Sequence, residues 1–270
     1  MSDKPEVPED DVEMGFFEHL GELRVRLVRA VWGILPGLGV AWYFKERLLE
    51  ILLDPLIFAY RQNGIEPEIH FQSLLDPFVA YLKISIIAGI LSASPWIFWQ
   101  LWGFLAPGLY RKEKLLAIPF VLASTLFFAG GALFGYFVVF PYGFQTFLEF
   151  AGELPSGELR LTPTIMIDAQ ISLSVRMLLA FGVVFEVPVI VSAISALGLV
   201  SWKGLLRFGR WWMIIATVIA ALLTPPDVAS QLMMLIPLIV LYFLSVGVAF
   251  LIDLKRGKAA KAAADEGYER

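Results

Sequence analysis

The sequence predicts an all-α polytopic membrane protein with six transmembrane helices. Hydrophobic residues make up 58% of the 270 residues, against roughly 45–50% apolar residues in a soluble domain. Charged residues account for only 17% and are concentrated in short stretches between long apolar runs. A hydrocarbon core about 30 Å thick requires about 20 apolar residues per helical crossing. Runs near this length occupy residues 28–44, 78–101, 115–140, 171–199, 211–223 and 228–252.

The fifth run is unusually short. It ends after 13 residues at Thr224, Pro225 and Pro226, and a helix of that length measures about 20 Å. Because this is less than the thickness of the hydrocarbon core, the fifth helix either includes flanking residues or lies in a locally thinned bilayer.

The distribution of lysine and arginine predicts that both chain ends face the cytoplasm. The segments on the side of the N-terminus carry 15 of the 21 basic residues, whereas the opposite segments carry 4. Short loops that are rich in Lys and Arg stay in the cytoplasm. With six crossings, the C-terminus then lies on the same side.

Three segments are expected along the chain. Residues 1–14 form a mobile acidic tail, residues 15–254 the six-helix membrane domain, and residues 255–270 a mobile cytoplasmic tail. Two long connections lie on the outer side. Residues 45–77 contain an amphipathic helix that Pro55 is expected to end or bend, and residues 141–168 have the composition of a turn-rich cap.

Composition also excludes several function classes. The chain has no cysteine, and its two histidines, His19 and His70, lie far apart in the sequence, so we expect no disulfide, no metal site and no redox cofactor. A net charge of −4 argues against binding to nucleic acid, which requires a basic surface. The bilayer itself is the expected environment.

Glu186 lies near the middle of the fourth run, where an ionised carboxylate costs about 2.5 to 3.5 kcal/mol. One interpretation is a hydrogen-bonded carboxyl group that ties two helices together. The other, which we favour, is a carboxyl group that faces a hydrated cavity or a partner helix, with Pro188 bending the helix beside it. Arg176 is about 15 Å away along the helix, so we expect Arg176 and Lys83 to reach outward to the headgroups.

Two acids, Glu22 and Glu113, occur within basic segments on the cytoplasmic side. Glu22 precedes Arg26 by four residues, so a local helical pair is the simpler interpretation, and a solvated surface pair is the simpler one for Glu113. The alternative is an exchangeable site, in which an incoming guanidinium replaces the local partner through bidentate hydrogen bonds.

The turn between the fifth and sixth runs carries further polar groups. We expect Asp227 to cap the sixth helix by accepting from backbone amides near Ser230. Thr224 and Gln231 remain as polar groups to which a partner helix can hydrogen-bond. Gly131 and Gly135 in the third run permit close internal packing of helices.

The sequence resembles the TatC family, the C subunit of the twin-arginine protein translocase. Five groups of residues carry the resemblance, in order along the chain: Phe16, His19, Leu20, Glu22, Leu23, Arg24 and Arg26; Pro95, Gln100, Trp102, Phe104, Pro107, Leu109 and Glu113; Tyr136, Phe137 and Pro141; Phe181, Gly182, Phe185, Glu186 and Pro188; and Leu223, Thr224, Pro225, Pro226, Asp227 and Gln231.

The resemblance implies a concave bundle with short fifth and sixth helices and a periplasmic cap. It implies a receptor and core subunit, not an enzyme, in a multimeric machine that exports folded proteins across the bacterial cytoplasmic membrane using proton-motive force. Its partners would be twin-arginine signal peptides and the single-span subunits TatA and TatB.

The resemblance also implies roles for individual residues. Glu22 and Glu113 would receive the paired arginines of a signal peptide, and Glu186 would line a concave, partly hydrated face. The remaining residues are Arg24, Phe104 and Leu109 at the peptide site, Thr224 and Gln231 at the site for the partner subunits, and Pro55, Tyr136, Pro188 and Asp227 as structural residues, with Pro55 in the outer cap.

Two other function classes are open from the residues alone. Glu186, Pro188 and Pro36 are typical of a secondary transporter for a small solute or ion, with an intramembrane carboxyl group and interrupted helices. Two related halves, which such a transporter often has, are not found in the sequence. A membrane-embedded hydrolase would require a histidine, cysteine or paired-carboxylate constellation, which the chain lacks.

Overall fold

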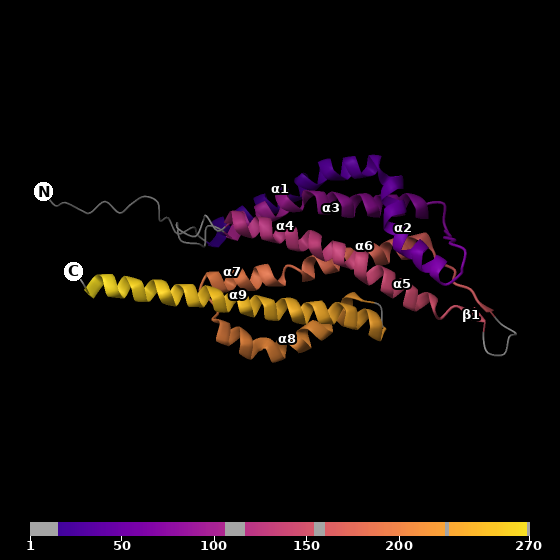
Figure 1. Cartoon of the computed structure of the whole chain (residues 1–270). Coiled ribbons are helices and arrows are strands. Elements are labelled where there is room, and N and C mark those ends of the chain that lie inside the picture. The colour runs from indigo at the N-terminus through magenta and orange to yellow at the C-terminus, as the bar shows by residue number, and fades with distance from the viewer. Residues whose placement is uncertain (1–15, 106–116, 154–159, 225–226, 269–270) are drawn as a thin grey trace.

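The computed structural model describes residues 16–105, 117–153, 160–224 and 227–268, which form a helical bundle (Figure 1). Its elements are α1 (Phe16–Tyr43), α2 (Lys45–Gln62), α3 (Asp76–Leu105), α4 (Ala117–Phe134), the π-helix η3 (Gly135–Val139), α5 (Phe140–Leu148), β1 (Gly152–Glu153), β2 (Arg160–Leu161), α6 (Ile167–Val184), α7 (Val187–Ala196), α8 (Trp202–Leu223) and α9 (Val228–Tyr268). β1 and β2 pair antiparallel. The predicted all-α fold is confirmed, with this short hairpin as an addition.

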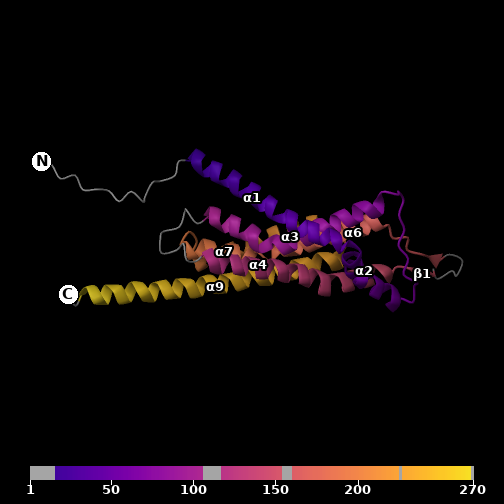
Figure 2. The same cartoon turned by 90° about the horizontal axis from the view of Figure 1, so that it is seen from above.

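Six helical segments of the described chain are long and apolar enough to cross a membrane, as predicted. They are Phe17–Tyr43, Asp76–Leu105, Ile118–Leu148, Ile167–Ala196, Trp202–Leu223 and Val228–Leu254. The start of α1 and the end of α9 lie at one end of the bundle, and α2 and β1 lie at the other (Figure 1). α1 and α9 lie on opposite sides of the bundle in both views (Figure 2). The cytoplasmic location of the chain ends stays a prediction from charge.

The fifth helix is longer than its apolar run because it includes flanking residues. Ser201 caps the start of α8 by accepting a hydrogen bond from the Gly204 N–H at 3.3 Å. Asp253 of α9 accepts a second one from the Trp202 N–H at 3.2 Å. The 22 residues of α8 measure about 33 Å, so the helix length does not require a thinned bilayer. α8 is still the shortest of the six described spans.

The prediction of a short sixth helix is wrong. α9 contains 41 residues and extends beyond Leu254, where its apolar span ends. Residues 255–268, which we expected to form part of a mobile tail, continue the helix because this segment is rich in alanine and lysine, both strong helix formers. The predicted acidic tail, residues 1–14, lies outside the described residues.

Close contact between α4 and α6 forms the centre of the bundle. At Gly131 an added Cβ would clash with the backbone carbonyl oxygen of Phe181, and at Gly135 it would lie 3.1 Å from the Phe181 ring. A Cβ at Gly182 would lie 2.7 Å from the ring of Phe128. Phe181 is fully buried. The predicted packing role of Gly131 and Gly135 is confirmed.

The fourth span is interrupted near its middle, as the proline in this run predicts. α6 ends at Val184 and α7 begins at Val187. Pro188 lies in the first turn of α7, where a missing N–H costs little. It has no N–H to donate to the carbonyl of Val184, four residues earlier. Glu186 therefore lies at a helix break.

The outer end combines α2, α5 and the segments between spans. The His70 N–H donates to the Ile165 carbonyl at 2.9 Å, and the Ile167 N–H donates to the His70 carbonyl at 2.8 Å. These bonds join the connection after α2 to the start of α6. The predicted turn-rich cap over residues 141–168 is helical up to Leu148, since α5 extends the third span. Burial, with the nearby Glu68 carboxylate, raises the pKa of the Tyr60 phenol in this cap.

Pro55 does not end α2, contrary to one of the two expected outcomes. α2 continues to Gln62, and Pro55 is buried within it. Because proline has no N–H, the carbonyl of Ile51 four residues earlier loses its helical donor. The Tyr136 hydroxyl of η3 donates to this same carbonyl at 2.7 Å. Two residues predicted separately as structural thus act at one point, where Tyr136 supplies the hydrogen bond that Pro55 removes.

A double-mutant cycle tests this link. Tyr136→Phe should lower the free energy of unfolding by about 0.5–1.5 kcal/mol in the parent protein, because the Ile51 carbonyl loses its donor. In a Pro55→Ala background the cost should be smaller, since the introduced alanine can donate its own N–H to that carbonyl. Thermal unfolding in detergent measures both values, and an equal cost in the two backgrounds would contradict the link.

Candidate functional site

Glu22 lies on the first turns of α1, at the end of the bundle that carries the start of α1 and the end of α9. Its Oε1 accepts from Arg26 Nε at 2.7 Å, and Arg26 Nη2 lies 2.7 Å from the same oxygen. The predicted pair between these residues is confirmed. Oε2 is buried and has no hydrogen-bond partner among the described residues, although His19 Nδ1 lies 3.7 Å away. One oxygen of this carboxylate is therefore saturated by Arg26, and the other is not.

The end of α3 forms a wall beside Glu22. The Phe104 ring stacks on the His19 imidazole with a centroid separation of 4.2 Å and an interplanar angle of 11°. Gly103 lets the Arg26 guanidinium approach, since an added Cβ there would lie 3.1 Å from its central carbon. The fold thus brings Phe104 to the Glu22 site across 82 residues of sequence, as the resemblance implies. Sequence spacing alone gives no sign of the stacking with His19.

Other predicted members of this site are not brought together in the described part of the chain. Arg24 is exposed and lies about 200° around α1 from Glu22, because consecutive residues turn by about 100°. Leu109 and Glu113 lie outside the described residues.

Glu186 is buried at the break between α6 and α7, with 7% of its surface accessible. Ser124 of α4 accepts from Trp102 Nε1 of α3 at 2.9 Å and also hydrogen-bonds with the Glu186 carboxyl group. Oε1 of Glu186 has no partner among the described residues. The geometry therefore favours the carboxyl group that ties helices together, which was the less favoured of the two interpretations.

The turn between α8 and α9 has the predicted cap. Asp227 Oδ1 accepts from the Ser230 N–H at 2.7 Å. Thr224 is buried, and its hydroxyl donates to the Ala220 carbonyl of its own helix at 2.8 Å. Gln231 is partly exposed on the first turn of α9.

One polar cluster was missed by sequence reasoning. Lys83 Nζ of α3 donates to the carboxylate of Asp168 and, at 2.7 Å, to the hydroxyl of Ser172, both on α6. Lys83 was expected to reach outward to the headgroups instead. The signal was a lysine within one apolar run and an aspartate just before another, but their pairing depends on which two helices pack together.

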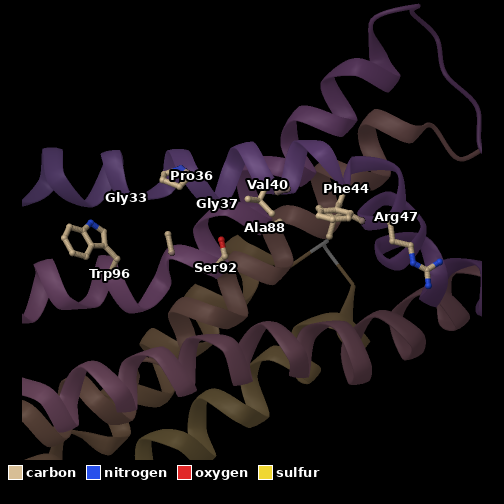
Figure 3. Close-up of a pocket in the computed structure, with 12 residues that line it drawn as sticks. Gly33, Pro36, Gly37, Val40, Phe44, Arg47, Ala88, Ser92 and Trp96 are labelled. Carbon is tan, nitrogen blue, oxygen red and sulfur yellow. The ribbon is translucent and has the colours of Figure 1, made fainter.

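An apolar groove of about 710 Å³ lies between α1, α3 and the start of α2 (Figure 3). Small residues, among them Gly33, Gly37 and Ala88, line it, with Trp96 at one end and Arg47 at the other (Figure 3). None of the predicted site residues that the structure describes lines this groove. The described residues also contain no group of three or more His, Asp or Glu side chains that could hold a metal ion.

Comparison with known proteins gives one consistent match. Residues 18–237 match the family model of the Sec-independent protein translocase protein TatC. The TatC protein of Desulforapulum autotrophicum is 42% identical over 250 residues, 93% of this chain and 89% of the relative. That of Aquifex aeolicus is 37% identical over 251 residues, 92% of this chain and all of the relative.

A solved crystal structure gives the same result. It is described as the twin-arginine translocase receptor TatC, and it superimposes with a TM-score of 0.74 at 37% identity, covering 87% of this chain and all of the other. None of these matches supports a secondary transporter. With its six apolar spans, the chain is a multi-pass protein of the bacterial inner membrane and a core component of a protein translocase. The chain belongs to the TatC family of Sec-independent protein translocase proteins.

Proposed function

We propose that this chain is the receptor of its translocase, and that Glu22 binds an arginine of a twin-arginine signal peptide. The observation that supports this is the asymmetry of the Glu22 carboxylate, whose Oε1 is held by Arg26 and whose Oε2 has no hydrogen-bond partner among the described residues. A guanidinium is the cation whose planar, forked donors match a carboxylate best.

Binding then consists of exchange at Glu22. An incoming guanidinium competes with Arg26 for Oε1. Because Oε2 is buried, the guanidinium donates to it only once Arg26 has released the carboxylate, so Arg26 holds the carboxylate in position when no peptide is present. The stacked rings of Phe104 and His19 form an apolar wall for the residues that follow the arginines. Glu113 is the proposed partner of the second arginine, with Leu109 beside it.

The partners and the energy source belong to the same proposal. The chain recruits the single-span subunits TatA and TatB into a multimeric complex. The proposed contact residues are Thr224, directly after α8, and Gln231 in the first turn of α9. It has no catalytic activity of its own, and proton-motive force drives the export of folded cargo. Six helices of this size are too few to enclose a folded protein, which explains why other subunits are needed.

Two variants, each measured for peptide binding and for co-purification with TatB, test this proposal. Glu22→Gln should bind a labelled peptide with two adjacent arginines and an apolar stretch roughly tenfold more weakly, because a charge-assisted pair is lost. It should still co-purify with TatB. Gln231→Leu should bind the peptide like the parent but lose most of the TatB. Fluorescence anisotropy measures the first property, and quantification of the purified complex measures the second.

Arg26→Gln separates direct binding from a structural effect. If Arg26 competes with the peptide, its removal should leave peptide affinity unchanged or increase it. If Glu22 only holds α1 against α3, Arg26→Gln and Glu22→Gln should weaken binding equally, and the proposal would be wrong. Unchanged affinity in Glu22→Gln would also refute it.

A further inference from the structure

Arg176 occupies an exposed position inside the fourth membrane span. Four exposed residues of α6 and α7 follow one another at intervals of seven and form a row: Ala169, Arg176, Val183 and Ile190. Arg176 is the only charged residue of this row. Val183 is 62% accessible and Ile190 50%. Since this row belongs to a membrane span, it faces lipid or another membrane protein. A charge at such a position requires a counter-ion or access to water.

The described residues supply no counter-ion to Arg176. None of their ion pairs includes it. Its Nε donates to the backbone carbonyl of Ser172 at 3.2 Å, and the Asp168 carboxylate is already bound by Lys83. Lys83 also donates to the Ser172 hydroxyl at 2.7 Å. Two cations and one carboxylate thus meet around Ser172, and the cluster carries a net charge of about +1.

The depth of Arg176 can be estimated from the length of the span. The 30 residues of the fourth span measure about 45 Å along the helix, whereas the hydrocarbon core is about 30 Å thick. Roughly 7 Å therefore extends beyond the core at each end. Arg176 follows Ile167, the first residue of the span, by nine residues, or about 13 Å.

The side chain points toward that end of the helix. Its bond to the Ser172 carbonyl, four residues earlier, directs it back by about one turn of 5.4 Å. The guanidinium consequently lies about 8 Å from the end of the span, close to the boundary between hydrocarbon and headgroups. The phosphate groups of lipids begin at this level.

We propose that Arg176, assisted by Lys83, binds the phosphate of a phospholipid in the leaflet opposite to the chain ends. The guanidinium offers two parallel N–H donors to phosphate oxygens, and the lipid phosphate neutralises the excess charge of the cluster. The apolar row below Arg176 contacts the acyl chains of the same lipid. A carboxylate on another membrane helix is the alternative occupant. The level of the guanidinium and its direction toward the headgroups favour the lipid.

Native mass spectrometry of the full chain in detergent, titrated with phosphatidylglycerol, tests the proposal. The parent should retain a lipid that Arg176→Gln binds roughly tenfold more weakly, as expected for the loss of a charge-assisted contact. Arg61→Gln removes a cation at the end of α2, outside the membrane spans, and should bind the lipid like the parent. Arg176→Lys, which keeps the charge but loses the paired donors, should bind the lipid with an affinity between those of the parent and Arg176→Gln.

Several outcomes would overturn the proposal. If Arg176→Gln retained as much lipid as the parent, Arg176 would not bind lipid, and a carboxylate of another membrane protein would be its partner. If Arg61→Gln lost as much lipid affinity as Arg176→Gln, the lipid would be attracted by the overall positive charge and not by a specific site. An equal loss in Arg176→Lys and Arg176→Gln would indicate packing rather than charge. If excess inorganic phosphate displaced the lipid, the site would be one for a free anion and not for a lipid.

Discussion

Replacing Gly131 by alanine is expected to lower the free energy of unfolding by about 2–3 kcal/mol. An added Cβ would clash with the carbonyl oxygen of Phe181, and it would lie 2.8 Å from the carbonyl carbon and 2.9 Å from Phe185 Cβ. Two of these atoms belong to the backbone of α6, so the strain cannot be relieved by rotating a side chain. Forcing an additional carbon into such a contact typically costs about 1–3 kcal/mol. Thermal unfolding in detergent measures the change.

Gly130 provides a matched control for this experiment. It is the preceding residue of α4, and a Cβ at Gly130 would meet no atom within 4 Å. Gly130→Ala should therefore leave stability unchanged or increase it by up to about 1 kcal/mol, because alanine favours a helix over glycine. Similar losses in both variants would show that helix propensity or insertion, rather than contact between α4 and α6, determines the result.

Asp168→Leu is the second substitution with a large expected effect, about 2 kcal/mol of destabilisation. It leaves the ammonium of Lys83 without a carboxylate, seven residues inside the second span. Breaking a fully buried pair costs about 3–5 kcal/mol, but 31% of the Lys83 side chain and 44% of the Asp168 side chain are accessible. Solvent and headgroups screen such a pair, so the expected cost is smaller.

The reverse substitution should be milder. Lys83→Leu leaves Asp168 in the first turn of α6, where the helix dipole stabilises a negative charge, so we expect a loss of about 1 kcal/mol. The double variant, which carries no charge at either position, should be more stable than Asp168→Leu alone. Glu50→Leu, in the exposed pair with Arg47, serves as a control and should change stability by less than about 0.5 kcal/mol. A double variant as unstable as Asp168→Leu would contradict the explanation by charge.

The candidate site could be predicted only in part from the sequence. The spacing of Glu22 and Arg26 predicts their pair, because residues four apart on a helix are neighbours, and Asp227 has the position of a helix cap. Both features are observed. The stacking of Phe104 on His19 could not be derived in this way, since it depends on the crossing of α1 and α3. The sequence favours a hydrated cavity or a partner helix beside Glu186. In the structure Glu186 is buried beside Ser124 of α4, a neighbour that no local pattern reveals.

Errors in the length of elements have a similar origin. Hydropathy counts apolar residues, whereas a helix continues as long as its backbone hydrogen bonds and caps are satisfied. α8 begins at Trp202 because Ser201 and Asp253 cap it, and α2 passes through Pro55 because Tyr136 replaces the missing donor. Asp253 and Tyr136 are far in sequence from the groups that they bind, so neither effect can be seen in a window of neighbouring residues.

By itself, the sequence determined that the chain is a membrane protein with six spans, and it determined the family. These properties follow from composition, the length of apolar runs and the order of short motifs, all of which are local. Only the tertiary structure decided which polar groups meet: Lys83 with Asp168, Tyr136 with the Ile51 carbonyl, and Glu186 with Ser124. Such pairings depend on helix packing, which sets the distance between residues that the sequence keeps apart.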